Sequence, residues 1–325
     1  MRADRPGERG AALLTVLLLV AVVGAVAAAT LERLNLATRQ GANAVSMAQA
    51  RAWADAAGTM ALVKIDTVLK QNPSRVSLAG GWSDTPFPLP IPDGIATARV
   101  RDAGNCFNLN SLVTVDPNGN YVTRPAAVMQ FARLLTLIGV PGSDGIAAAT
   151  ADWIDSDGSP NPGGAEDAVY AGRTPAYRTA NTMMVDASEI RAVAGVTPDA
   201  YTRLRRYVCA LPNTDPAPIN VNTIEPERAA LIAAMAPGGV SIDQVRQALA
   251  ARPPLGWSSA GEFWSRGPLA SANAGDAAAT TSVTTKWFRV TSDVSLGRIA
   301  LRQIALVDAR RLPTRIVRRV WSDGE

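Results

Sequence analysis

An acidic segment near the middle of the chain carries the side chains best suited to chemistry. Carboxylates at such density repel one another unless a cation neutralises them, and Ca2+ takes six to eight oxygen ligands from flexible loops. The segment therefore predicts a calcium site, with a solvated acidic loop as the plainer alternative. It holds five carboxylates among turn-forming residues: Asp152, Asp155, Asp157, Glu166 and Asp167, with Gly158, Pro160, Pro162, Gly163 and Gly164.

The spacing in this segment matches a known calcium loop only in part. Asp155, Asp157 and Glu166 occupy positions 1, 3 and 12 of an EF-hand-like loop. Position 6, which is glycine in an EF-hand, is Pro160, so a true EF-hand is not expected. We predict a structural calcium ion in a loop of another kind, with Asp155, Asp157, Glu166 and Asp167 as ligands.

Histidine is absent from the 325 residues, and cysteine occurs twice. The lack of histidine excludes Ser-His-Asp and Cys-His catalytic arrangements and every His-ligated metal site, and we predict that the protein is not an enzyme. Cys106 and Cys209 lie 103 positions apart and cannot form a zinc site by themselves. In an exported chain a disulfide between them is predicted, whereas in a cytosolic chain two reduced buried thiols are expected.

The amino terminus contains a short polar segment followed by a long apolar one. Residues 11–31 carry no charge, and a helix of this length spans roughly 30 Å, the hydrocarbon thickness of a bilayer. Arg2, Arg5 and Arg9 precede it, so the positive-inside rule places the amino terminus in the cytoplasm and the bulk outside.

The polar segment, residues 1–10, is predicted to be a prepilin-type leader that is cut between Gly10 and Ala11, with Ala11 then methylated. Two alternatives remain open. An ordinary secretory signal peptide would be cut after the apolar run, where residues 25–30 supply small side chains, and a plain signal anchor would not be cut.

The sequence after the apolar run favours the prepilin interpretation. Residues 32–70 contain no proline and are amphipathic, so one helix of about 55–60 residues is predicted, half in lipid and half in water. Pilin-like subunits usually carry glutamate at the fifth residue after the cut, and here that residue is Thr15. A subunit without this carboxylate gains less from being placed on a neighbour in lipid, which favours the first position, at the tip.

The remaining sequence divides into strand-like ends around a helical centre. Residues 95–101, 286–296, 298–309 and 314–321 have strand patterns, and the proline-rich stretch Trp82–Gly94 predicts a loop. We therefore assign residues 32–112 and 282–325 to a pilin-like domain. Residues 113–281 form an inserted α-helical domain, in which residues 270–282 are predicted to be a loop.

Within the predicted insert, helices are expected over 125–139 and 197–208, after a cap at Asn222 or Thr223, and after a capping box formed by Ser241 and Gln244. The last two helices resemble a helix-hairpin-helix DNA-binding module. The hairpin, residues 234–241, has no lysine or arginine for phosphate, so DNA binding is not expected. The formal net charge of +4 is also too small to indicate a nucleic-acid surface.

Several motifs in one order resemble the GspK family, the large minor pseudopilins of bacterial type II secretion systems. They are the leader, Thr15, CFNLNSLV (106–113), ADWIDSDGSPNPGGAED (151–167), INVNT (219–223) and the closing FRVTSDVSLGRIALRQ (288–303). The Asn-x-Asn pairs in two of them, Asn108 with Asn110 and Asn220 with Asn222, are expected to be turn and cap residues. The resemblance covers nearly the whole chain.

The resemblance implies an α+β, pilin-like fold, with a long amino-terminal helix, a small antiparallel sheet and a helix-hairpin-helix or SAM-like insert. It also implies a single-pass inner-membrane protein whose bulk lies in the periplasm, at the tip of the pseudopilus. There it would prime assembly with the I-type and J-type minor pseudopilins and support export of folded proteins. Further expected partners are prepilin peptidase, the major pseudopilin, the secretin and exoproteins. Calcium is expected in the acidic segment. The alternative function is a membrane-tethered helix-hairpin-helix component of DNA uptake.

Overall fold

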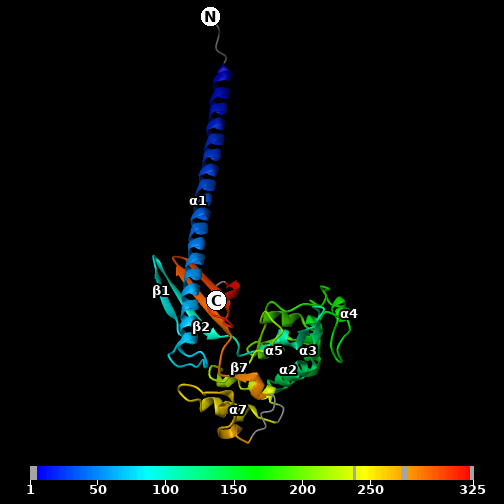
Figure 1. Ribbon diagram of the computed structural model, residues 1–325. Helices are drawn as coiled ribbons and strands as arrows, with labels where there is room; N and C mark the ends of the chain where they lie inside the picture. Colours follow the sequence, from blue (N-terminus) through cyan, green and yellow to red (C-terminus); the bar gives the residue numbers. More distant parts are fainter. Residues whose placement is uncertain (1–5, 237–238, 272–276, 323–325) are drawn as a thin grey trace.

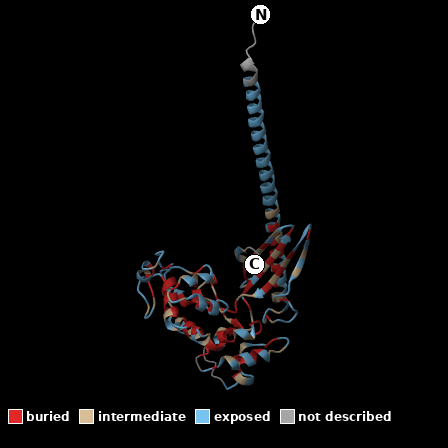
Figure 2. Ribbon diagram, turned by 180° about the vertical axis from the view of Figure 1, so that it is seen from behind, coloured by how far each residue is buried: buried red, intermediate tan, exposed pale blue. Residues whose placement is uncertain are grey.

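The computed structural model describes residues 6–236, 239–271 and 277–322. Helix α1 (Pro6–Gln71) runs without interruption and projects from the rest of the molecule (Figure 1). Residues 11–45 are exposed throughout (Figure 2), and the span Ala11–Gln71 is long and apolar enough to cross a membrane. The predicted long helix is confirmed.

The lower half of α1 packs on a sheet through a stripe of small side chains. Ala50, Ala54, Ala57, Ala61 and Ile65 recur at intervals of three or four residues, lie on one face and are buried. Alanine brings the helix backbone close to the strands below it. The core between the helix and the sheet contains side chains from three separate segments of the sequence: the helix, the early strand β2 and the late strands β9 and β10.

The sheet is antiparallel, with strand order β1-β2-β9-β10-β11. Four of its strands match the predicted ones. The fifth, β1, corrects the prediction of a loop over Trp82–Gly94, because residues 87–91 pair with β2 despite Pro88 and Pro90. Proline is tolerated because β1 is an edge strand, where alternate backbone nitrogens face away from the partner. The bounds are β1 Phe87–Ile91, β2 Gly94–Asp102, β9 Trp287–Leu296, β10 Ile299–Asp308 and β11 Arg315–Ser322.

Between β2 and β9 the chain forms a separate body, which we call the insert, at the end of the molecule opposite the amino terminus (Figure 1). Its elements are short and mostly helical: β3 (Phe107–Asn108), η1 (Leu109–Leu112), β4 (Val113–Val115), β5 (Tyr121–Thr123), α2 (Pro125–Leu137), α3 (Ser143–Ile154), α4 (Asp167–Ala171), η2 (Ala187–Ala192), α5 (Pro198–Leu204), β6 (Val208–Cys209), β7 (Ile219–Asn220), η3 (Pro226–Arg228), α6 (Ala230–Met235), α7 (Ile242–Ala250), α8 (Ala260–Trp264), η4 (Gly267–Leu269), α9 (Ala277–Thr280) and β8 (Thr281–Ser282).

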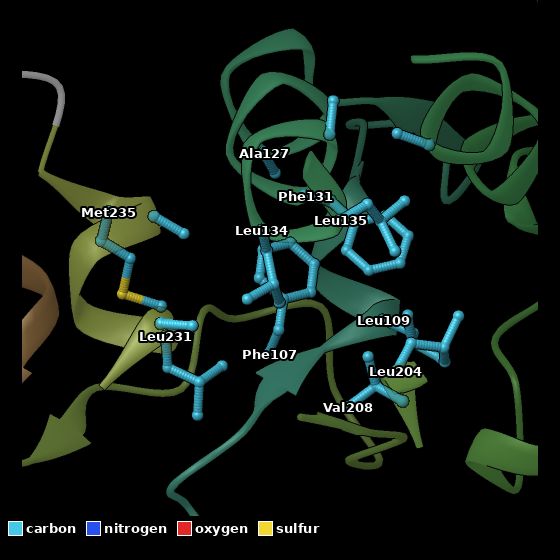
Figure 3. Packing of buried hydrophobic residues seen from close by; sticks show 14 of the residues in the cluster. Phe107, Leu109, Ala127, Phe131, Leu134, Leu135, Leu204, Val208, Leu231 and Met235 are labelled. Atoms are coloured by element: carbon cyan, nitrogen blue, oxygen red, sulfur yellow. The ribbon is translucent and has the colours of Figure 1, made fainter. Parts of the chain in front are cut away.

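The core of the insert is distinct from the core under α1. Figure 3 shows its centre, where Phe107 lies against α2 and the ring centroids of Phe107 and Phe131 are 4.9 Å apart. Leu134 and Leu135 of the same helix and Leu231 of α6 complete this part of the core. The residues just before position 113, from Phe107 to Leu112, thus pack with the insert.

Several predicted boundaries differ in detail. Helix α5 ends at Leu204, because Val208 pairs with Phe107 in a parallel bridge between β6 and β3. Glu225, not Asn222 or Thr223, precedes the turn of η3. Helix α9 and strand β8 lie within the predicted loop 270–282, whose residues 272–276 are outside the described part.

The capping box of Ser241 and Gln244 is present at the start of α7. Helices α6 and α7 correspond to the predicted helical pair and contact each other. Residues 237–238 of the hairpin between them are not described.

Candidate functional site

The acidic loop connects the carboxyl end of α3 to the start of α4. Asp155 follows the last residue of α3, and Glu166 directly precedes α4. The loop folds back so that carboxylate oxygens of Asp155, Asp157 and Glu166 all lie within 4.8 Å of one another. Twelve residues of irregular chain thus bring three of the four predicted ligands together.

Asp152 holds this loop in shape. Its carboxylate is fully buried, and Oδ1 accepts a hydrogen bond from the backbone N–H of Asn161 at 3.0 Å. Oδ2 accepts one from the backbone N–H of Ala165 at 2.6 Å. A side chain on Gly164 would collide with the same carboxylate, so this glycine permits the close approach. Asp152 is therefore a scaffold for the loop, with both oxygens already occupied.

Two oxygens of the cluster have no hydrogen-bond partner among the described residues. Asp155 Oδ2 accepts from the Thr123 hydroxyl at 2.7 Å, whereas Asp155 Oδ1 and Glu166 Oε1 are buried and unpaired. Burial, and then the neighbouring carboxylates, raise the pKa of Glu166 to about 7; burial also raises the pKa of Asp155 to about 6. Buried, unpaired carboxylate oxygens are the donor set that a hard divalent cation requires, so the residues present fit calcium.

Asp167 lies outside the cluster. Its Oδ1 accepts hydrogen bonds from the backbone N–H and the hydroxyl of Thr179, at 3.0 and 2.8 Å. The Arg178 Nε lies 3.9 Å from Oδ2, and these contacts together lower the pKa of Asp167. Asp167 therefore anchors the start of α4 to a neighbouring segment.

The two cysteines meet at the base of the insert. Cys106 and Cys209 form a disulfide with their Cα atoms 5.8 Å apart, next to the β3–β6 bridge. Cys106 lies at the start of the insert and Cys209 near its middle in sequence, so the bond closes a loop of 103 residues.

The two Asn-x-Asn motifs join irregular segments that are distant in sequence. Asn110 Nδ2 donates to the carbonyls of Met184 and Leu211, and its Oδ1 accepts from the backbone N–H of Met184. Asn108 caps η1 and bonds to later loop carbonyls. Asn108 thus acts as a cap, as expected, and both side chains also act as long-range links, which the spacing alone did not indicate.

The second motif joins the insert to the pilin-like unit. Asn220 Nδ2 donates to the Val76 carbonyl, just after α1, at 3.0 Å. Asp102, at the end of β2, accepts hydrogen bonds from the hydroxyls of Thr223 and Thr285. Burial raises the pKa of Asp102. These buried contacts fix the place where the chain leaves the sheet and returns to it.

The structure describes only the second half of the predicted leader, residues 1–10. Residues 1–5 lie outside the described part, and Gly10 and Ala11 are within α1. The Thr15 hydroxyl donates to the Ala12 carbonyl of its own helix at 2.9 Å. The side chain at this position is thus satisfied locally.

Comparison with known proteins gives a consistent result. Two family models described as type II secretion system (T2SS), protein K match residues 105–213 and 219–286. The chain is 35% identical over 315 residues to the type II secretion system protein K of Klebsiella pneumoniae, covering 96% of each chain. It is 34% identical over 320 residues to that of Pectobacterium carotovorum subsp. carotovorum, covering 98% of this chain and 97% of the relative.

A solved structure shares the fold. It is the crystal structure of the GspK-GspI-GspJ complex from the enterotoxigenic Escherichia coli type 2 secretion system. The match has a TM-score of 0.74 and 30% identity, and covers 85% of this chain and 96% of the other. The pilin-like α+β fold is thereby confirmed, and the chain belongs to the type II secretion system protein K family of minor pseudopilins.

Proposed function

We propose that this protein is the tip subunit of a type II secretion pseudopilus, where it primes assembly with I-type and J-type minor pseudopilins and supports export of folded proteins. The observation that carries the proposal is the similarity, over most of the chain, to a protein solved in complex with GspI and GspJ. The shape agrees, because the insert lies at the far end of the molecule from the membrane-spanning part of α1 (Figure 1). A bulky body there obstructs the addition of another subunit above it, and the protein acts through this geometry without catalysis.

Co-purification tests this proposal. The chain is expected to form a stoichiometric complex with the I-type and J-type subunits encoded in the same genome when all three are expressed together. A Thr15→Glu variant is the matched test of position: introducing the carboxylate is expected to leave this complex intact, since the first subunit is not placed onto an existing neighbour. Failure of the unmodified chain to bind either subunit would contradict the proposal. Specific, salt-dependent binding to duplex DNA would favour the DNA-uptake alternative.

We also propose that a prepilin peptidase cuts the chain between Gly10 and Ala11 and methylates Ala11, leaving residues 11–31 in the inner membrane and the bulk in the periplasm. The support is the exposed apolar half of α1 directly after a basic segment. Coexpression with the peptidase should give a mass lower by residues 1–10, plus one methyl group. A product cut after residue 30 would instead indicate an ordinary signal peptide.

The acidic loop is proposed to bind one Ca2+ through Asp155, Asp157 and Glu166. The two buried, unpaired oxygens support this assignment, because desolvated carboxylates without partners are costly. Calcium supplies a charge that holds the α3–α4 loop closed. Calorimetry on calcium-free protein should show binding that Glu166→Gln weakens at least tenfold, whereas Asp167→Asn, at the next position, changes it less than threefold. Equal effects of the two variants would contradict the assignment.

A further inference from the structure

A polar cavity lies between the sheet and the insert, away from the acidic loop. It has a volume of about 260 Å3 and is lined by five arginines and three carboxyl groups. The arginines come from both bodies: Arg101 and Arg289 from the sheet, and Arg205, Arg206 and Arg228 from the insert. The lining thus has an excess of positive charge that neither the fold nor the proposed function explains.

The sheet contributes two arginines that face each other. Arg101 on β2 and Arg289 on β9 are directly opposite in the strand pairing. Like charges at such a pair are destabilising, so something must compensate for their being neighbours. Asp84 compensates for Arg101, since its carboxylate accepts from the Arg101 Nε at 2.7 Å and from a second guanidinium nitrogen.

Arg289 has no such compensation. Within the described part of the chain, its guanidinium forms no hydrogen bond or ion pair, and the same holds for Arg205 and Arg206. Desolvation by the surrounding protein, and then the charges of Arg228 and Arg101, lower the pKa of Arg289, although its side chain is exposed to solvent. Arginine keeps its proton under these conditions, so the repulsion remains.

The acidic groups near Arg289 already have partners. Asp102 is held by the hydroxyls of Thr223 and Thr285 and the Gly104 N–H, and Glu225 lies 3.5 Å from Arg228. Asp186 attracts Arg289 electrostatically, but its carboxylate caps η2. The cavity therefore presents guanidinium donors without matching acceptors.

We propose that this cavity binds an oxyanion, a carboxylate or a phosphate-like group, and that the bound anion ties the insert to the sheet. Planar guanidinium groups bind pairs of anionic oxygens, and donors from both bodies converge on one volume. The anion has two conceivable sources with the same chemistry: a small ion from solution, or a carboxylate of a bound protein subunit.

The test uses the full chain in detergent with sulfate and succinate as probes, at constant ionic strength set with sodium chloride. Saturable binding is expected, with a rise in melting temperature of about 2–4 °C at ten times Kd. Arg289→Gln should weaken binding at least tenfold. The affinity of Arg289→Lys should fall between those of the unmodified chain and the Gln variant, because lysine keeps the charge and loses the paired donors. Arg298→Gln, an exposed arginine in the β9–β10 turn, is the matched control and should change binding less than twofold.

Without a probe, Arg289→Gln is expected to melt no lower than the unmodified chain, since it removes a like charge opposite Arg101. The proposal is overturned if neither probe binds saturably, if the Arg289 and Arg298 variants behave alike, or if Arg289→Gln lowers the melting temperature without a probe. Adding the I-type and J-type subunits then identifies the source. Loss of sulfate binding assigns the cavity to a subunit's carboxylate, and unchanged binding assigns it to a small ion.

Discussion

The pilin-like unit and the insert are built in different ways. In the former, long strands hydrogen-bond to one another and a stripe of alanines seats α1 on the sheet. In the insert the elements are short, and side chains such as Asn110 and Asp152 take over the hydrogen bonds that ladders supply elsewhere. Regular structure satisfies its own backbone, whereas irregular structure needs polar side chains buried at defined places. The two bodies should therefore fail through different kinds of substitution.

The largest expected effect is that of removing the disulfide, which should destabilise the insert and leave the pilin-like unit little changed. Replacing Cys106 and Cys209 together by serine removes a link that closes a loop of 103 residues, and the expected cost is about 3–5 kcal/mol. Both cysteines belong to the insert, so hydrogen exchange followed by mass spectrometry should show faster exchange there and little change in β2, β9 and β10. Equal loosening of both bodies would show that they unfold as one unit.

Loss of one buried amide should come next. Asn110→Ala leaves the Met184 N–H and the Met184 and Leu211 carbonyls without their partner, at an expected cost of about 2–4 kcal/mol. Asn118→Ala is the control, because Asn118 is exposed, and it should cost about 0.5 kcal/mol or less. Denaturant unfolding of both variants measures the difference. Similar costs would mean that buried amides are not what holds the insert together.

This difference also explains which features the sequence indicates. Sequence patterns predicted α1, β2, β9, β10, β11 and α2. A regularly spaced buried face explains this for β2, β9, β10, α2 and the lower half of α1, whereas β11 has only exposed and half-buried positions. They missed β1, whose prolines are tolerated because β1 is an edge strand of the sheet. Edge position is a property of the sheet and is not encoded in the five residues themselves.

The acidic loop was predictable in composition but not in detail. Carboxylate density and spacing correctly indicated that Asp155, Asp157 and Glu166 come together. Sequence proximity also suggested Asp167, but its side chain bonds to Thr179, twelve residues later. The arginine cavity had no sequence signal, because its lining comes from segments separated by up to about two hundred residues.

The pilin-like unit should be sensitive to size where the insert is sensitive to polarity. Ala57→Leu forces a larger side chain between α1 and the sheet and is expected to cost about 2 kcal/mol. Ala52→Leu, on the exposed side of the same helix, should cost about 0.5 kcal/mol or less. Hydrogen exchange should now rise in β2 and β9 and remain unchanged in the insert, the reverse of the disulfide result. A stable, unchanged Ala57→Leu protein would mean that the helix is not closely seated.

The smallest expected effect depends on pH and is confined to the insert. Burial raises the pKa of Asp155 to about 6 and that of Glu166 to about 7, above the ordinary values of 3.8 and 4.5 that apply when the chain unfolds. The folded state therefore binds more protons, and calcium-free protein should lose roughly 1–2 kcal/mol as the pH rises from about 4 to 7. The double variant Asp155→Asn, Glu166→Gln keeps both side chains neutral and should remove this dependence of stability on pH. Thermal unfolding of the variant and of the unmodified chain across this pH range measures the difference. Calcium should restore the lost stability only in the unmodified chain and most strongly above pH 7, because binding requires the charged carboxylates. If the stability of the two calcium-free proteins depended on pH in the same way, the proposed coupling would be refuted.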